Sequence, residues 1–218
     1  SIWSKSKDGG KTWTHEHLDA LSARMPKNHF MQMRVLADGT WIKGRQPVLG
    51  QIAFYTSTDE RQTWQEISRI GKELGTHDVR LCSLEVLRDG TLVVPVAALY
   101  WKKEKETEIA KGKWEDSKSI FYVSRDGGKT FSQPTNIGHW GHEINIAELP
   151  SGRLLAVIRY QRQTLPSDPP NILDITGASQ FQRLWPYKHV FVSDSKNGGK
   201  TWSRNRQVAT GYGQCHGA

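Results

Sequence analysis

A glutamate and an arginine flank one predicted hairpin in a way that would bring their side chains together. Glu143 precedes, and Arg159 follows, a tight turn predicted at Ser151-Gly152. If the two strands pair symmetrically about Ser151 without a bulge, Glu143 and Arg159 face each other. A carboxylate beside a guanidinium can form an anion-binding site with an acid of altered pKa. The alternative is a simple cross-strand salt bridge.

Five further ionisable residues come near the predicted starts of strands, as Glu143 does. They are His29, Asp78, Arg80, His142 and His216. If these strand starts share one rim, the side chains surround a common mouth and could bind a polar ligand; the alternative is a solvated rim without chemistry. The wide spacing of the three histidines does not by itself indicate a metal site, so we predict neither a metal nor a cofactor.

The elements that position these residues follow from a repeat of eight residues, Ser-x-Asp-x-Gly-x-Thr-Trp. Its four copies lie at residues 6–13, 57–64, 124–131 and 195–202. The Asp can accept backbone N–H bonds from the residues after it, and the Gly supplies a conformation that a Cβ would penalise. The Thr and the aromatic residue then begin a strand. Arg61 replaces this Gly in the second copy, which should therefore be the most strained or the most altered one.

A second repeat lies between these copies and predicts another hairpin in each period. Its turns are at Asp38-Gly39, Asp89-Gly90 and Ser151-Gly152, each between apolar runs. Two hairpins per period make four antiparallel strands, which is one blade of a propeller. The predicted fold is therefore all-β, a β-propeller of four-stranded antiparallel blades.

The blades can be counted along the chain. Three whole blades are predicted between two partial ones, at residues 1–27 (partial), 28–75, 76–138, 139–210 and 211–218 (partial). Such a set does not close a ring, although propellers close to remove exposed sheet edges. We therefore expect a single partial propeller domain from a longer, six-bladed protein; the alternative is a small or circularly completed propeller.

The blade topology explains why the ionisable residues share a rim. The two kinds of turn lie on one rim of the propeller. The starts of first strands and the long loops at 101–118 and 161–188 lie on the opposite rim. Propeller ligands gather at one mouth of the central channel, and the loop-rich rim is the natural candidate.

The repeat resembles the Asp box of sialidases and related β-propellers, in which it is structural and lies away from the active site. The segment 141–159 also resembles the sialidase segment that carries a catalytic Glu and, sixteen residues later, an Arg. This resemblance implies that Glu143 activates a tyrosine nucleophile. It implies that Arg159 is one of three arginines that hold the sugar carboxylate.

Much of the sialidase site has no counterpart in this sequence. The first and third clamp arginines, the acid Asp and the nucleophilic Tyr are expected to lie outside the chain, and Tyr212 comes too early to be that Tyr. No family motif supports Asp78 or Arg80. His142, next to Glu143, either contacts substrate or has only a packing role. The chain alone is therefore expected to be inactive.

Three functions remain open. The first is an exo-acting glycoside hydrolase resembling sialidases, which removes terminal sialic acid-like sugars with retention. The second is a propeller glycosidase or lyase that acts on another sugar. The third is a non-catalytic propeller that binds glycans or proteins. The resemblance favours a secreted or periplasmic location, whereas the residues themselves do not indicate a compartment, sugar linkage or oligomeric state.

Composition and charge limit the classes of partner that the protein is expected to bind. The formal net charge is +8, but no basic helix or RNA-binding motif accompanies it, so nucleic acid is not a predicted partner. No apolar run approaches the roughly 18 residues of a membrane span. The two cysteines, Cys82 and Cys215, do not make a disulfide framework. A glycan substrate is the expected partner.

Overall fold

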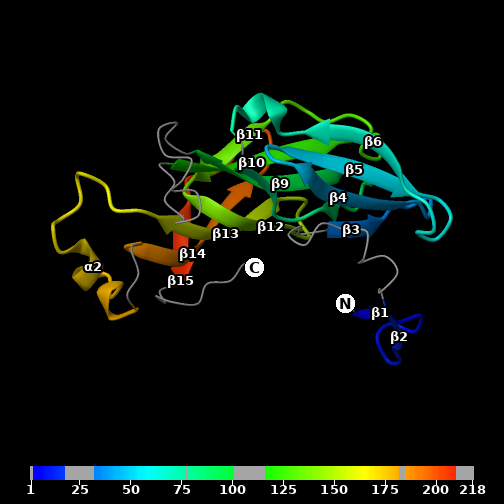
Figure 1. The fold of residues 1–218 in the computed structure, drawn as a ribbon, viewed down its shortest axis with the longest axis horizontal. Coiled ribbons are helices and arrows are strands. Elements are labelled where there is room, and N and C mark those ends of the chain that lie inside the picture. The colour runs from blue at the N-terminus through cyan, green and yellow to red at the C-terminus, as the bar shows by residue number, and fades with distance from the viewer. Residues whose placement is uncertain (1, 18–31, 77, 101–115, 182–184, 210–218) are drawn as a thin grey trace.

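The computed structural model describes residues 2–17, 32–76, 78–100, 116–181 and 185–209. Most of these residues form antiparallel strands, which Figure 1 shows grouped into sheets. The first two strands form a hairpin, β1 (Ile2–Lys5) and β2 (Thr14–His17). The next four form what we call the first sheet, in the order β3 (Gln32–Val35), β4 (Trp41–Val48), β5 (Gln51–Ser57) and β6 (Gln65–Ile70).

Two further sheets complete the described architecture. The middle sheet contains β7 (Asp78–Leu81), β8 (Glu85–Val86), β9 (Leu92–Tyr100), β10 (Asp116–Ser124) and β11 (Thr135–His139). The last sheet runs in the order β12 (Gly141–Glu148), β13 (Leu154–Arg162), β14 (Tyr187–Ser195) and β15 (Arg206–Ala209). The short helices are η1 (Lys72–Leu74), α2 (Ile172–Ile175) and η3 (Ser179–Phe181). The fold is all-β, with antiparallel sheets arranged as propeller blades, and this prediction is confirmed.

The middle sheet lies between the other two and is buried on both faces (Figure 1). Alternate residues of β9, namely Leu92, Val94, Val96 and Ala98, belong to the core shared with the first sheet. Val93, between them, belongs to the core shared with the last sheet, which includes Ile144 and Ile158. Side chains alternate across a strand, so burial on both sides requires the continuous apolar run of β9.

A proline divides the inner strand of the middle sheet into β7 and β8. Pro95 lies within β9 and has no N–H to donate to a neighbouring strand. β7 pairs with Val96–Leu99 and β8 with Leu92–Val93, so the gap between them lies opposite Pro95. The Cys82 N–H still donates to the Pro95 carbonyl at 3.1 Å. The inner strand is thereby interrupted beside the propeller axis.

The eight-residue repeats form turns of one geometry, which we call Ser–Asp turns. In the third turn, the Ser124 hydroxyl accepts the Gly128 N–H at 2.8 Å, and Asp126 accepts the Thr130 N–H at 2.9 Å and its hydroxyl at 2.6 Å. These bonds lower the pKa of Asp126 to about 2, the hydroxyl of Thr130 being the largest cause. The carboxylate is thus occupied by its own turn, as expected for a structural role.

The fourth turn keeps this geometry with Asn197 in place of Asp. The Asn197 amide oxygen accepts the Thr201 N–H at 2.9 Å, and the amide nitrogen now donates to the Thr201 hydroxyl at 2.8 Å. The Thr hydroxyl can donate or accept, so it accommodates either side chain. The second turn is the strained copy, since Glu60 (φ 55°) and Arg61 (φ 76°) occupy the left-handed conformations that glycines take in the other turns.

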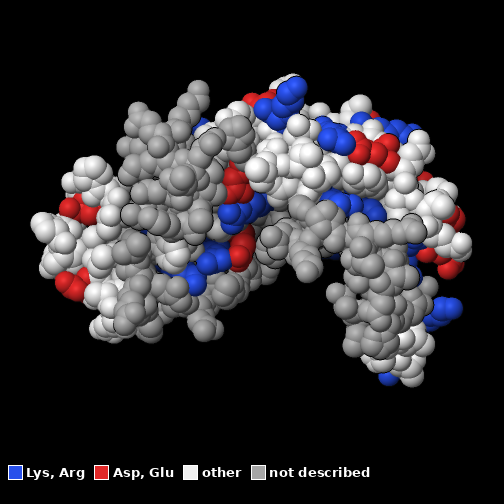
Figure 2. Space-filling model, viewed as in Figure 1, with Lys and Arg blue, Asp and Glu red and all other residues white. Residues whose placement is uncertain are grey.

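No helix in the described ranges is long and apolar enough to cross a membrane. Figure 2 shows acidic and basic side chains interspersed over the face in view. On that face the positive net charge is therefore not gathered into one continuous basic surface.

The two glycines of the fourth turn should tolerate alanine differently. A Cβ at Gly199 would lie 2.0 Å from the Phe121 ring, whereas a Cβ at Gly198 meets no atom within 4 Å. Gly198→Ala should therefore cost only the left-handed strain, about 1 kcal/mol. Gly199→Ala adds overpacking and should cost about 3 kcal/mol in total. Urea unfolding of both variants measures the difference, and equal losses would contradict this packing.

Candidate active site

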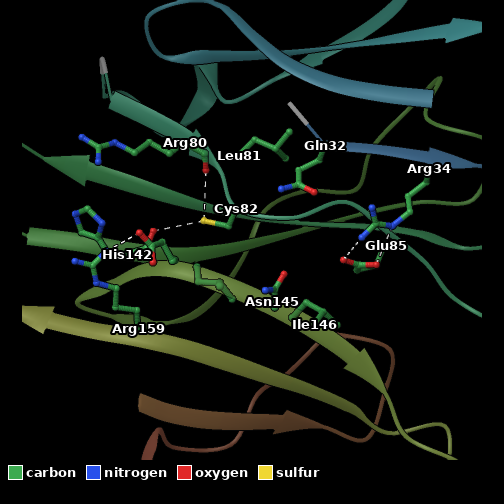
Figure 3. A pocket seen from close by; sticks show the side chains of 12 residues that line it. Gln32, Arg34, Arg80, Leu81, Cys82, Glu85, His142, Asn145, Ile146 and Arg159 are labelled. Atoms are coloured by element: carbon green, nitrogen blue, oxygen red, sulfur yellow. Dashed lines mark hydrogen bonds and ion pairs between the residues drawn. The ribbon is translucent and has the colours of Figure 1, made fainter. Parts of the chain in front are cut away.

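The inner strands of the three sheets enclose a cavity of about 720 Å³, which we call the axial cavity. Figure 3 shows Arg80, His142 and Arg159 directed toward one end of it, and an ion pair of Arg34 with Glu85 at the other. Arg80 comes from β7, His142 from β12 and Arg159 from β13. Two sheets therefore supply the cationic end, which we call the mouth.

Glu143 and Arg159 are in contact at this mouth. Arg159 Nη1 donates to Glu143 Oε1 at 2.5 Å. The Arg159 side chain is 11% exposed and that of Glu143 is 39% exposed, so the carboxylate reaches solvent while the guanidinium is held in the wall. Within the described residues, Arg159 Nε has no hydrogen-bond partner. The sequence prediction that this pair would meet across the hairpin agrees with the observed contact.

The register of this hairpin differs from the symmetric one. Ile144 pairs with Ile158, but Gly141 pairs with Tyr160, so His142 and Glu143 together oppose Arg159. This β-bulge begins directly after Trp140, which has a positive φ of 64°. A Cβ at Gly141 would lie 1.7 Å from Ser119 Oγ, so β12 can enter this close to β10 only with glycine there. Bulges re-aim side chains next to sites, and this one puts two adjacent side chains beside one guanidinium.

Asp78 and Arg80 form a second carboxylate–guanidinium pair at the mouth. Arg80 Nε donates to Asp78 Oδ1 at 2.8 Å and Arg80 Nη2 to Asp78 Oδ2 at 2.7 Å. They are two residues apart on β7 and so share one face of the strand. The fork of Arg80 is therefore engaged by its own carboxylate, whereas Arg159 donates to Glu143 through one nitrogen.

His142 lies between the cations of the mouth and is buried, with 9% of its surface exposed. Burial lowers its pKa to about 3, and the positive charges of Arg80, Arg159 and Lys188 act in the same direction. The imidazole is therefore neutral over the physiological range and can act as a hydrogen-bonding group rather than as a cation.

Two other predicted site residues, His29 and His216, lie outside the described residues. The structure therefore does not show whether they reach the mouth. In the described part of the chain, no group of three or more His, Cys, Asp or Glu side chains is arranged to hold a metal ion.

Several residues in or beside the cavity were not predicted as site residues from the sequence. Arg34 and Glu85 join the first and middle sheets through two hydrogen bonds, at 3.1 and 2.7 Å. Lys188, on β14, is buried near His142. Burial raises the pKa of Cys82 to about 12, so its thiol is not a nucleophile at neutral pH.

The long loop after β13 is anchored at the same rim. Arg162, the last residue of β13, donates to both carboxylate oxygens of Asp168 at 2.6 and 2.7 Å. The two side chains are 10% and 11% exposed. The Leu165 N–H also donates to Asp168 at 2.7 Å. This ion pair holds the beginning of the loop that leads to α2 (Figure 1).

Several solved structures of low sequence identity share this architecture, and some of them are glycan-cleaving enzymes. The chain is similar to an α-L-arabinanase from Penicillium chrysogenum (TM-score 0.60, 18% identity, 86% of this chain and 52% of the other). It is similar to an α-L-arabinofuranosidase from Fusarium graminearum (TM-score 0.57, 18% identity, 95% and 58%). A Hadza microbial sialidase also matches (TM-score 0.54, 16% identity, 96% and 40%). No family model and no curated protein matches the sequence.

These similarities show the propeller fold. The chain spans about half the length of the solved structures that it matches. At 16–18% identity the likeness carries no residue-by-residue correspondence of the sites.

The neutral state of His142 should make stability depend on pH. The folded pKa is below the unfolded value, so the stabilisation is present above about pH 6.5 and is lost as the pH falls toward 3. The loss should approach about 1.4 kcal/mol per pH unit below pH 6. His142→Asn should flatten this slope between pH 6.5 and 4.5 in urea unfolding. A wild-type slope in His142→Asn would contradict the assignment.

Proposed function

We propose that the protein is an exo-acting glycoside hydrolase of the propeller type, and that its mouth binds an acidic, sialic acid-like sugar. The observation that carries the proposal is the contact of Glu143 with Arg159 at the open end of the axial cavity. The four Ser–Asp turns and the segment 141–159, which resemble the Asp boxes and one site segment of sialidases, support it. The fold shared with a sialidase, an α-L-arabinanase and an α-L-arabinofuranosidase is consistent with it.

Arg159 is the residue best placed to bind the sugar carboxylate. It donates to Glu143 through Nη1 alone, so its planar fork can make a bidentate contact with an incoming carboxylate. Arg80, by contrast, already binds Asp78 through two nitrogens. Neutral His142 lies beside Arg159 and offers hydrogen bonds to sugar hydroxyls. Arg80 and Asp78 are proposed to shape the mouth around the ligand.

Glu143 is proposed to act through a nucleophile that the resemblance assigns to tyrosine. Its exposed carboxylate can accept the proton of a phenol that attacks the anomeric carbon as the bond to the aglycone breaks. The leaving oxygen would take its proton from the acid Asp that the resemblance places outside the chain. A neutral phenol meets less repulsion from the carboxylate of an acidic sugar than an aspartate or glutamate nucleophile would. Arg159 holds the carboxylate of Glu143 in place at the mouth. The tyrosine itself is not identified in the chain.

A second candidate function is favoured by the Asp78–Arg80 pair. Asp78 puts a second carboxylate at the mouth that carries Glu143, and most glycosidases use two carboxylates. A neutral sugar such as arabinose would then be cleaved without a carboxylate clamp. The structural similarity to an α-L-arabinanase and an α-L-arabinofuranosidase makes this the natural comparison.

The test is hydrolysis of a fluorogenic α-sialoside and a fluorogenic α-L-arabinofuranoside by a protein carrying the complete propeller. Glu143→Gln and Arg159→Ala should each lower kcat/KM on the sialoside at least about 100-fold, since one loses a base and the other a charge-stabilising group. Glu148→Gln is the matched control, because Glu148 lies on the same strand and contacts Arg88 at the opposite rim.

The substrate preference separates the candidates. Turnover of the arabinofuranoside alone, with loss in Asp78→Asn, would favour the two-carboxylate enzyme. A folded protein that turns over neither substrate would discard both and leave a binding role.

A further inference from the structure

A second cavity, of about 480 Å³, lies between the outer parts of the middle and last sheets. It shares no lining residue with the axial cavity. One wall comes from the end of β11 and from Trp140, and the other from Tyr160 of β13 and Phe191 of β14. The segment 202–205, which begins at the last residue of the fourth Ser–Asp turn, completes it. We call it the outer cavity; its volume is within the roughly 300–1,000 Å³ of small-ligand sites.

Aromatic side chains form much of its wall. Tyr160 and Phe191 are stacked, with ring centroids 4.4 Å apart and an interplanar angle of 28°. Trp202 contacts Phe121 edge to face, with centroids 5.1 Å apart. Such rings are rigid apolar surfaces, and the C–H face of a sugar ring is the apolar part of a polar molecule.

Two buried polar atoms on residues that line this cavity have no hydrogen-bond partner among the described residues. Trp202 Nε1 and Asn205 Oδ1 are inaccessible to solvent and make no hydrogen bond within the described residues. Buried polar groups are nearly always satisfied, and leaving one unpaired costs about 1–3 kcal/mol. The amide of Asn205 packs closely on Gly138, since a Cβ added at this glycine would lie 2.4 Å from the amide nitrogen.

We propose that the outer cavity binds a glycan, with one sugar ring against the aromatic wall and its hydroxyls paired with Trp202 and Asn205. A hydroxyl both donates and accepts, so one type of group serves the indole N–H and the amide oxygen. The exposed Arg204 adds a cationic donor at the edge. This site is separate from the proposed cleavage site and does not require it.

The place of the outer cavity gives it a use in catalysis. Trp140 lines it, and Gly141, His142 and Glu143 follow directly in the chain. The two cavities are therefore lined by neighbouring residues at the start of β12. A polymer held in the outer cavity would keep its other segments near the mouth, which raises their effective concentration there.

The fourth turn suggests a variant that should still fold. The third Ser–Asp turn carries Phe131 where the fourth has Trp202, and Phe131 packs against the core of its own sheet. Trp202→Phe therefore keeps an aromatic ring known to suit this turn and removes only the indole N–H. Asn205→Ala removes the second orphan group, and Trp64→Phe, at the same position of the second turn, is the matched control.

The experiment is titration calorimetry with arabinotetraose, xylotetraose and 3′-sialyllactose. At least one probe should bind wild type and Trp64→Phe equally, and bind the double variant Trp202→Phe/Asn205→Ala about tenfold more weakly, as expected for two lost hydrogen bonds. Trp202→Phe alone should show part of this loss, which keeps the test valid if the double variant is unstable.

Two outcomes would overturn the proposal. One is that no probe binds the folded wild-type protein, and the other is that the double variant binds every probe as tightly as wild type does. Glu143→Gln and Arg159→Ala distinguish the two cavities, since glycan binding in the outer cavity should survive both substitutions. Binding lost in those variants and kept in the double variant would place the probe in the axial cavity instead.

Discussion

Burial of the middle sheet on both faces is the constraint on which the site depends. Because β9 packs against the first sheet on one side and the last sheet on the other, few positions of this sheet remain for polar groups. On β7, Val79 and Leu81 are buried in the core, and the alternate residues Asp78 and Arg80 form the pair at the mouth. The same close packing allows glycine alone at Gly141, and so fixes where β12 begins. The apolar contacts between sheets thereby determine which charged groups meet at the axis.

The Ser–Asp turns serve the same packing from the opposite rim. Each turn satisfies backbone N–H groups of its own with a serine hydroxyl and a carboxylate or amide. The Gly128 carbonyl of the third turn also accepts the Ser68 hydroxyl of the first sheet. The turn can then place a small residue or a ring between blades, as Gly199 and Trp202 do against Phe121. The rim with the Ser–Asp turns is therefore structural, whereas the long loops and the ionisable side chains of the mouth lie on the opposite rim. Binding sites are commonly carried by loops on a rigid scaffold in this way.

The parts of the fold that local chemistry determines could be predicted from the sequence. The Asp-Gly hairpins, the Ser–Asp turns and the strained Arg61 follow from short-range rules, and the contact of Glu143 with Arg159 follows from the position of Ser151. The bulge at His142 could not be predicted in this way, because it depends on Gly141 meeting Ser119 across two sheets. The ion pair of Arg34 with Glu85 joins residues 51 positions apart, and nothing local marks it. The split of the inner strand does have a cause in the sequence, because Pro95 lies within an apolar run and has no N–H to donate to the strand beside it.

The charges around His142 set the chemistry that the mouth can support. Arg80, Arg159 and Lys188 act on His142, and Asp78 and Glu143 are the carboxylates paired with the two arginines. With three cations against two carboxylates, this group carries a small positive excess and a neutral imidazole. A ligand carboxylate would therefore enter a site in which Arg80 and Arg159 each already have one carboxylate partner. Binding would then exchange or share an existing ion pair rather than bury an unpaired cation. A neutral sugar would leave both pairs intact and gain only hydrogen bonds. Arg159 contacts Glu143 through one nitrogen, so a ligand carboxylate could bind Arg159 without breaking its ion pair with Glu143.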